Sequence, residues 1–424
     1  MTTTTDRPAR LRMPVRRQHA DPGQKPMIVI WEATRACQLA CRHCRAEAAP
    51  GRHPLELTTD EATTLMEQVL SFGKPAPIFI ISGGDCFERP DLYEIVRRGV
   101  AMGLHVAVSP SGTTKLNPDS LKALQDAGVN AISLSLDGAT EESHDGFRRV
   151  PNTFRTTVDG WRTARELGMK VQVNSVVARH NVYELPDIAA MVREYGAMTW
   201  SGFLLVPTGR GVDLGALSAL ECEDVLNIFY DMGHAVPVKT TEGHHFRRVN
   251  IQRHVLAQRG VDHVEAMKLG PLYHQLRERV VELGLHEGDR GRRPPIAVSS
   301  GNGFVFINHV GQVAPSGFLE VPAGDVRVTP LPDIYRSSEI FTGVRNPELL
   351  EGKCGRCEYR YVCGGSRARA YNATGNIFAE EPLCPYEPGT FPYPQDVDAL
   401  RDAAARRGPA AHPARRTDTD GAPA

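Results

Sequence analysis

Short apolar runs alternate with amphipathic stretches along the first half of the chain, from residue 27 to about residue 207. The apolar runs have the length and β-branched character of strands, and the stretches between them have the pattern of amphipathic helices. The pattern predicts strands at residues 28–32, 78–82, 105–109, 131–136, 171–177 and 200–206. It predicts helices at residues 59–72, 91–102, 118–127, 154–167 and 185–195. Six successive β/α repeats are typical of a parallel sheet with helical crossovers.

The predicted helices carry start and stop signals. Thr58 or Thr59, followed by acidic residues, is a suitable N-cap for the first helix. A glycine, which favours the left-handed backbone that ends a helix, follows each of the five. These glycines are Gly73, Gly103, Gly128, Gly168 and Gly196.

Six strands are too few to close the usual eight-stranded barrel, so the expected fold is α/β, an open and partial (β/α)6 barrel of TIM type. Function is expected at the edge formed by the carboxyl ends of the strands. We expect the barrel at residues 27–215, a mixed bridging segment of unassigned topology at 216–300, and a second domain at 301–388. Residues 1–26 and 389–424 are predicted to be disordered tails, the second with one short helix.

The composition restricts the classes of function. Of the 424 residues, 41% are hydrophobic, which is enough for a full core. The 49 Lys and Arg nearly balance the 50 Asp and Glu, so the formal net charge of -1 favours neither nucleic acid nor an anionic membrane. No apolar run approaches the about 18 residues that span a bilayer, and the amino terminus has no secretory segment. We expect a soluble, cytoplasmic protein with no nucleic-acid or membrane partner.

Seven of the nine cysteines fall into two groups, a distribution that favours metal or cluster ligands over a disulfide framework. The first group, Cys37, Cys41 and Cys44, follows the first predicted strand. Three thiolates on a 4Fe-4S cubane leave one iron without a protein ligand, and an open position lets a cluster bind and reduce a substrate. The alternative is a structural zinc site completed by His43 or His53, although such sites usually have two pairs of ligands.

The C-x3-C-x2-C spacing after the first strand resembles the radical S-adenosylmethionine (SAM) superfamily, with His43 at that family's aromatic position. In that family the open iron chelates SAM, and an electron from the cluster cleaves SAM to methionine and a 5′-deoxyadenosyl radical. The resemblance implies a 4Fe-4S cluster on Cys37, Cys41 and Cys44, bound SAM, and an electron donor such as flavodoxin or ferredoxin.

Further segments resemble the SAM contacts of the family. The run Ser82-Gly-Gly-Asp85 is similar to the Gly-Gly-Glu motif that contacts the methionyl amino group, and the segment from Ser133 to Arg148 is similar to the part that contacts ribose and carboxylate. The residues that the resemblance assigns to SAM are Gly83, Gly84, Asp85, Ser135, Arg148, Asn174 and Leu205. Taken singly, a Gly-Gly pair is an ordinary turn, and a lone Asn or Leu on a strand is commonly part of the core.

Four cysteines form the second group: Cys354, Cys357, Cys363 and Cys384. Four thiols saturate one cluster or one zinc ion, and a saturated cluster is suited to electron transfer. The run Cys363-Gly-Gly-Ser-Arg-Ala resembles the SPASM or shorter Twitch extension of radical SAM enzymes. A full SPASM domain carries seven cysteines, and its upstream Pro-Cys position is here Pro315-Ser316. The resemblance implies one auxiliary 4Fe-4S cluster, with a zinc ribbon as the alternative.

Two cysteines lie outside both groups. Cys222 falls in a predicted helical stretch and is expected to be a small packing residue. Cys86 directly follows the two glycines, where relatives commonly have proline, and is the candidate catalytic thiol. The alternative for Cys86 is a small loop residue without a chemical role.

Several segments resemble a SPASM/Twitch subgroup that includes the enzymes converting iron-coproporphyrin to haem and those trimming propionates in d-type haem synthesis. They include the run from Pro315 to Leu319 and the runs that surround Cys354 and Cys363. For a propionate, the implied chemistry is hydrogen abstraction beside a carboxylate, loss of CO2, and removal of one electron by the auxiliary cluster.

A basic run that resembles the same subgroup provides candidate substrate ligands. Its members are His244, His245, Arg247 and Arg248. Their side chains would bind carboxylates through charge-assisted hydrogen bonds. An exposed basic loop without such a role is an equal alternative.

Two other functions stay open. The same extension occurs in enzymes that crosslink, epimerise or thioether-bridge ribosomal peptides, so a peptide or another natural product is an alternative to a small-molecule substrate. About 26 residues precede the first strand, too few for a separate leader-binding domain, which disfavours a peptide. The third function is a non-catalytic iron-sulfur scaffold, which needs none of the SAM contacts.

Overall fold

The apolar runs of the first half form six adjacent parallel strands in the computed structural model, which describes residues 14–18, 20–288 and 292–406. The strands are β1 (Ile28–Glu32), β2 (Ile78–Ser82), β3 (His105–Val108), β4 (Ala131–Ser135), β5 (Lys170–Val177) and β6 (Thr199–Leu204). All six predicted strands are present, with ends that differ by at most two residues. The α/β class and the open barrel are therefore confirmed.

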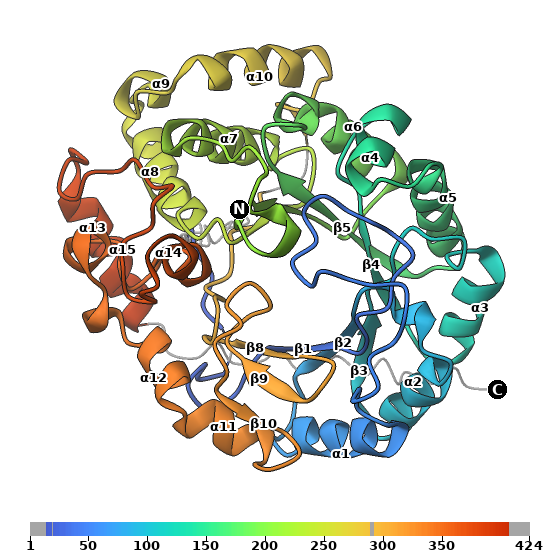
Figure 1. Cartoon of the computed structure of the whole chain (residues 1–424). Coiled ribbons are helices and arrows are strands. Elements are labelled where there is room, and N and C mark those ends of the chain that lie inside the picture. Colours follow the sequence, from blue (N-terminus) through green and yellow to red (C-terminus); the bar gives the residue numbers. More distant parts are fainter. Residues whose placement is uncertain (1–13, 19, 289–291, 407–424) are drawn as a thin grey trace, which may run out of the picture.

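The five predicted helices lie on the outside of this sheet (Figure 1). They are α1 (Thr59–Leu70), α2 (Leu92–Ala101), α3 (Pro118–Asp126), α5 (Thr153–Glu166) and α6 (Leu185–Tyr195). Thr58 caps α1 in a reciprocal capping box with Glu61, and all five predicted helix-ending glycines have positive φ. One further helix, α4 (Glu141–Arg148), was not predicted.

The sheet extends beyond the six predicted strands on both sides. β7 (Val238–Thr241) pairs with β6 in parallel, and β8 (Phe304–Ile307) pairs with β1 in parallel. β9 (Gln312–Ala314) and β10 (Gly324–Asp325) follow in antiparallel pairs. The strand order is β10-β9-β8-β1-β2-β3-β4-β5-β6-β7, which places β1 in the interior of the sheet.

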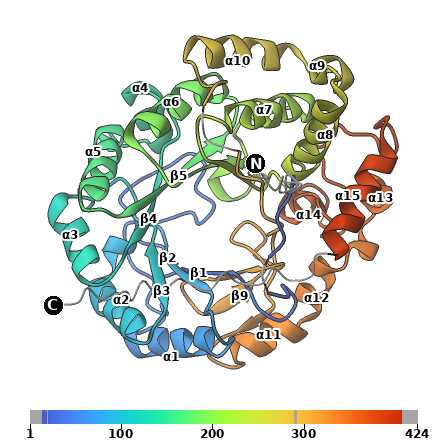
Figure 2. The same ribbon diagram turned by 180° about the vertical axis from the view of Figure 1, so that it is seen from behind.

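The second half of the chain supplies the remaining helices. They are α7 (Ala219–Met232), α8 (Phe246–Arg259), α9 (His263–Ala266), α10 (Pro271–Glu282), α11 (Leu331–Ser337), α12 (Glu339–Arg345), α13 (Gly352–Arg356), α14 (Arg367–Thr374) and α15 (Pro394–Arg406). Short 3-10 turns are η1 (Cys86–Glu88), η2 (Val182–Glu184), η3 (Gly209–Gly211) and η4 (Pro347–Leu349). Helices α13 to α15 lie beside α8 in both ribbon views (Figures 1 and 2).

The segment at 216–300, which the sequence left without a topology, contains β7 and α7 to α10. The boundaries at residues 215, 300 and 388 stay predictions. Of the two predicted disordered tails, residues 1–13 and 407–424 lie outside the described residues, and α15 falls within the second tail. Among the described residues, no helix combines the length and apolar character needed to cross a bilayer.

Candidate functional site

The first cysteine group lies in the loop that follows β1, at the edge where the parallel strands end. Backbone and side-chain contacts fix this loop. The N–H of Cys37 donates to the carbonyl of Ala49 over 2.8 Å, and Arg210 of η3 donates to the carbonyls of Cys41 and Ala48 over 3.0 and 3.1 Å. The loop that carries the three thiols is therefore held by hydrogen bonds within the loop and by hydrogen bonds from η3, which follows β6.

Each of the three sulfur atoms accepts a hydrogen bond. Cys37 Sγ accepts from the N–H of Leu39 at 3.4 Å, Cys44 Sγ from that of Ala48 at 3.4 Å, and Cys41 Sγ from the Arg148 guanidinium at 3.6 Å. Burial nevertheless raises the pKa of Cys37 to about 11. Binding of a metal cation displaces the proton of such a buried thiol and leaves a thiolate. The hydrogen bonds donated to the three sulfur atoms therefore fit a metal cluster.

Within the described residues, no group of three or more His, Cys, Asp or Glu side chains is arranged to hold a single metal ion. The support for a cluster comes instead from the chemistry of the donors around the thiols. Both histidines of the zinc alternative pack against other aromatic rings. His43 stacks on Phe147 with ring centroids 4.6 Å apart, and the His53 ring packs edge-on against His309 at 5.2 Å.

The two glycines after β2 pack against the backbone of the cysteine loop. The N–H of Gly84 donates to the carbonyl of Thr34 over 2.8 Å, and the next N–H, of Asp85, donates to that of Ala36 over 2.7 Å. A Cβ on Gly83 would lie 2.6 Å from the Thr34 oxygen, and one on Gly84 would lie 2.5 Å from the Ala36 oxygen. Only glycine permits this approach, so the pair positions the loop that carries the thiols.

Gly84→Ala should therefore push the cysteine loop away from β2. We expect it to lower the free energy of unfolding by about 1–3 kcal/mol, as overpacking does, and to lower the iron retained after reconstitution. Denaturant unfolding and iron analysis measure both. Gly51→Ala is the matched control, because a Cβ there meets no atom of the described chain within 4 Å. Equal losses in the two variants would contradict the assignment.

Asp85 and Cys86 point into the protein. The buried Asp85 carboxylate accepts from Thr113 Oγ1 at 2.6 Å and from the N–H of Phe87 at 3.2 Å, while burial raises the pKa of Asp85. The Cys86 side chain is fully buried in the main core, and burial raises the pKa of Cys86 well above its usual value. This placement favours the alternative, in which Cys86 is a packing residue.

Helix α4, which was not predicted, brings Arg148 to the cysteine loop. Its guanidinium is buried between Cys41 Sγ and the carboxylate of Asp137, with which it forms an ion pair. Burial alone would raise the pKa of Asp137, but the charge of Arg148 holds it well below its usual value. Sequence reasoning did not single out Asp137, although a charged residue directly after a buried strand was a usable signal.

The other predicted SAM residues lie on the neighbouring strands β4 and β5 or directly after β6. Ser135 of β4 is in register with Asn174 of β5, and the Asn174 side-chain oxygen accepts from Gln172 over 2.7 Å. Leu205 directly follows β6 and is buried. The fold therefore brings Ser135 and Leu205 to the same edge as the first cysteine group, and Asn174 lies beside Ser135 in the sheet.

A stack of three rings lies beside the cluster loop. Phe147 is sandwiched between His43 and His180, with ring centroids 4.6 and 3.7 Å apart and rings nearly parallel. Burial lowers the pKa of His43 to about 3, so its ring is neutral. The neutral His43 ring thus packs as an aromatic side chain would at this position of the C-x3-C-x2-C motif.

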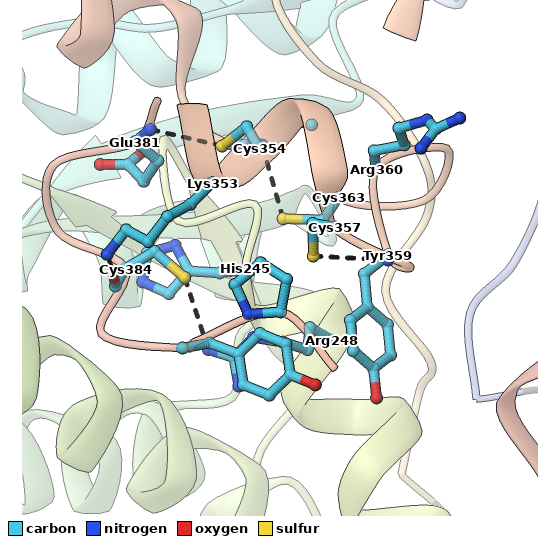
Figure 3. Close-up of a pocket in the computed structure, with 14 residues that line it drawn as sticks. His245, Arg248, Lys353, Cys354, Cys357, Tyr359, Arg360, Cys363, Glu381 and Cys384 are labelled. Carbon is cyan, nitrogen blue, oxygen red and sulfur yellow. Dashed lines mark hydrogen bonds between the residues drawn. The ribbon is translucent and has the colours of Figure 1, made fainter. Parts of the chain in front are cut away.

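The four cysteines of the second group line a single pocket (Figure 3). All four sulfurs accept a hydrogen bond: Cys354 from the N–H of Glu381 at 3.3 Å, Cys357 from that of Tyr359 at 3.5 Å, Cys363 from that of Gly365 at 3.5 Å, and Cys384 from Arg248 at 3.9 Å. Burial raises the pKa of Cys357 to about 12. These donors are of the kind that stabilise thiolates bound to iron.

The predicted substrate ligands lie at this second group, at the start of α8. All four side chains are buried, which argues against the alternative of an exposed basic loop; the four are His244, His245, Arg247 and Arg248. Arg248 donates to both carboxylate oxygens of Glu223, at 2.8 and 2.5 Å, and Arg247 donates to the carbonyl of Val362 at 3.0 Å. The two guanidiniums are bound by the protein itself, so we do not assign them to substrate carboxylates.

A buried ion pair ties the second group to the barrel. Arg369 donates to both oxygens of Glu381 at 2.8 Å and to the carbonyls of Leu204 and Leu205 at 3.1 Å each. The backbone of Glu381 in turn bonds to Cys354 Sγ. One guanidinium thus links a ligand of the second group to the end of β6.

Comparison with known proteins decides the family. The model of the Radical SAM superfamily matches residues 31–192. An AdoMet-dependent heme synthase of Nitratidesulfovibrio vulgaris is 40% identical to this chain over 365 residues, covering 85% of the chain and 92% of that protein. The chain belongs to the radical SAM superfamily. Membership of this enzyme family implies a 4Fe-4S cluster and SAM as cofactors.

Further relatives of this radical SAM enzyme agree. An AdoMet-dependent heme synthase of Methanosarcina barkeri is 38% identical over 373 residues, covering 86% of this chain and 97% of that protein. The crystal structure of Streptococcus suis SuiB bound to S-adenosylmethionine superimposes with a TM-score of 0.60 at 12% identity, covering 86% of this chain and 78% of SuiB. That likeness shows the fold, and the two named relatives confirm the resemblance to radical SAM enzymes of haem biosynthesis.

Arg369→Met should destabilise this radical SAM enzyme strongly. It leaves the Glu381 carboxylate buried without its partner, a change that costs about 3–5 kcal/mol of unfolding free energy. Arg279→Met is the matched control, since the Arg279 pair with Asp187 lies at the surface and should contribute little. Denaturant unfolding compares the two variants. Similar stabilities would show that the buried pair does not secure the second group.

Proposed function

We propose that this enzyme binds its SAM cluster through Cys37, Cys41 and Cys44 and one auxiliary 4Fe-4S cluster in a SPASM/Twitch extension at residues 301–388. The auxiliary ligands would be Cys354, Cys357, Cys363 and Cys384. Support comes from the donors around each thiol, since every sulfur of both groups accepts an N–H from the backbone or from arginine. The auxiliary cluster and its count of one are parts of this proposal.

The chain's own residues would position SAM at the carboxyl edge of the sheet. When bound, the SAM cluster supplies the electron that cleaves SAM to methionine and a 5′-deoxyadenosyl radical. Gly83 and Gly84 hold the cysteine loop, Ser135 and Leu205 lie at the same edge, and Asn174 lies beside Ser135. Arg148 is already bound by Cys41 Sγ and Asp137, so its contribution to SAM binding would be the positive charge that it places beside the cysteine loop. Flavodoxin or ferredoxin is the proposed electron donor.

The proposed reaction is an oxidative decarboxylation of tetrapyrrole propionates, which makes the enzyme an oxidoreductase. Each propionate side chain becomes a vinyl group by losing one hydrogen atom, one CO2 and one electron. The hydrogen atom goes to the 5′-deoxyadenosyl group, and the auxiliary cluster, when bound, supplies an acceptor for the electron. The observation that carries this proposal is the 40% identity over 85% of the chain to a protein named AdoMet-dependent heme synthase.

An anaerobic assay tests the substrate. Reconstituted, reduced enzyme is incubated with SAM and iron-coproporphyrin III, and the products are followed by mass spectrometry. We expect 5′-deoxyadenosine together with porphyrin that has lost CO2. Formation of 5′-deoxyadenosine without any change in the porphyrin would overturn the tetrapyrrole proposal and favour a peptide or another natural product. The absence of 5′-deoxyadenosine under all conditions would favour a scaffold.

A further inference from the structure

A fully buried histidine faces the second cysteine pocket without a hydrogen-bond partner. His245 immediately precedes α8, has 0% of its surface exposed, and lines the pocket together with the four cysteines (Figure 3). Across the described part of the chain, neither its Nδ1 nor its Nε2 has a hydrogen-bond partner. A buried polar atom without a hydrogen-bond partner destabilises the folded protein, so a group that fills this pocket and accepts a hydrogen bond from His245 would remove that penalty.

The charged groups around His245 are already paired with one another. Arg248 is bound by Glu223, and Glu381 is bound by Arg369 and by the N–H of Ser366. The backbone carbonyl of His245 accepts from Val249 at 3.0 Å, which fixes the residue at the start of the helix. The ring is therefore held in place beside the sulfur ligands while its nitrogens stay free of protein partners in the described structure.

We propose that a ring N–H of His245 donates a hydrogen bond to a sulfur atom of the auxiliary cluster and raises the reduction potential of that cluster. An imidazole carries at least one N–H in either protonation state, and cluster sulfurs are hydrogen-bond acceptors. Such a bond stabilises the reduced, more negative cluster more than the oxidised one. The inference rests on the proposed auxiliary cluster and deepens its role, because a higher potential favours uptake of the electron that a propionate releases.

Redox titration followed by electron paramagnetic resonance tests the role of His245. His245→Phe fills the space without a donor, so the midpoint potential of the auxiliary cluster should shift to a more negative value. His245→Gln retains an N–H donor, so its midpoint potential should lie between those of His245→Phe and the unaltered protein. His254→Phe is the matched control on the same helix, because His254 also has an unpartnered ring nitrogen in the described structure but does not line the pocket. The SAM cluster serves as an internal reference whose potential should not move.

The outcomes separate this inference from the proposed function. An unchanged potential in His245→Phe, with full iron content, overturns the inference. Loss of the auxiliary cluster from His245→Phe also overturns it, because His245 would then be a ligand or a folding requirement. A chain with Cys37, Cys41 and Cys44 all replaced by alanine should still bind one cluster, and binding none would overturn the auxiliary cluster itself. In the unaltered protein labelled with 15N-histidine, electron paramagnetic resonance should detect a weak hyperfine coupling between a histidine nitrogen and the reduced auxiliary cluster. The absence of this coupling would contradict the hydrogen bond.

Discussion

Replacing Cys41 with alanine should abolish the formation of 5′-deoxyadenosine. Cys41 is one of the two buried cysteines of the first group and contacts Arg148, and without its thiolate the proposed SAM cluster loses one of its three protein ligands. We expect the variant to lose about half of the bound iron, because one of the two proposed four-iron clusters is affected. Iron analysis and chromatography of nucleosides after incubation with dithionite and SAM measure both effects.

Cys222→Ala provides the matched control for this experiment. Cys222 is also buried but lies in α7, outside both cysteine groups, so its replacement should leave the iron content and SAM cleavage intact. Circular dichroism would show that both variants fold. Continued 5′-deoxyadenosine formation by Cys41→Ala would contradict the assignment of the first group to the SAM cluster.

Replacing Cys384 with alanine should separate SAM cleavage from product formation. The first cysteine group is untouched, so 5′-deoxyadenosine should still form, but the proposed electron acceptor loses a ligand. Since outer partners of a metal site already contribute about 10–100-fold, we expect product formation to fall by more than about 100-fold. Measuring 5′-deoxyadenosine and decarboxylated porphyrin in the same reaction gives the amount of product formed per SAM cleaved.

The comparison between the two cysteine variants makes this prediction specific. Cys41→Ala should lose both SAM cleavage and porphyrin decarboxylation, whereas Cys384→Ala should lose only porphyrin decarboxylation. If Cys384→Ala formed decarboxylated porphyrin at the rate of the unaltered enzyme, the second group would have no part in electron removal. If it lost SAM cleavage as well, the second group would be needed for the integrity of the barrel rather than for the reaction.

The first half of the fold could be predicted because local pattern and tertiary position agree there. Strands such as Ile78–Ser82 are continuous apolar runs, and each is separated from the next by a helix with clear ends. The strands β7 and β10 could not be located in this way, and neither could the place of β8 beside β1. They have two to four residues each, and their place in the sheet depends on pairing with distant segments.

The candidate site was predictable to the extent that its chemistry lies in local spacing. The cysteines of each group are near one another in sequence, so their number and order suggested the ligands. The environment of Arg248 was not visible in the same way, because Glu223 and Cys384 come from remote parts of the chain. The sequence showed a basic run, and only the fold shows that Arg248 pairs with Glu223 inside the protein while Arg247 donates to a backbone carbonyl.

The position of β1 in the sheet has a consequence for biosynthesis. β1 carries the cysteine loop at its end, yet one of its two neighbours, β8, is made only after most of the polypeptide has left the ribosome. Pairing between such distant segments is slow to form, so the nascent amino-terminal half exposes an open strand edge beside the three thiols of the first group. We expect iron delivery to follow translation rather than accompany it, and chains truncated before Phe304 to aggregate instead of accepting a cluster.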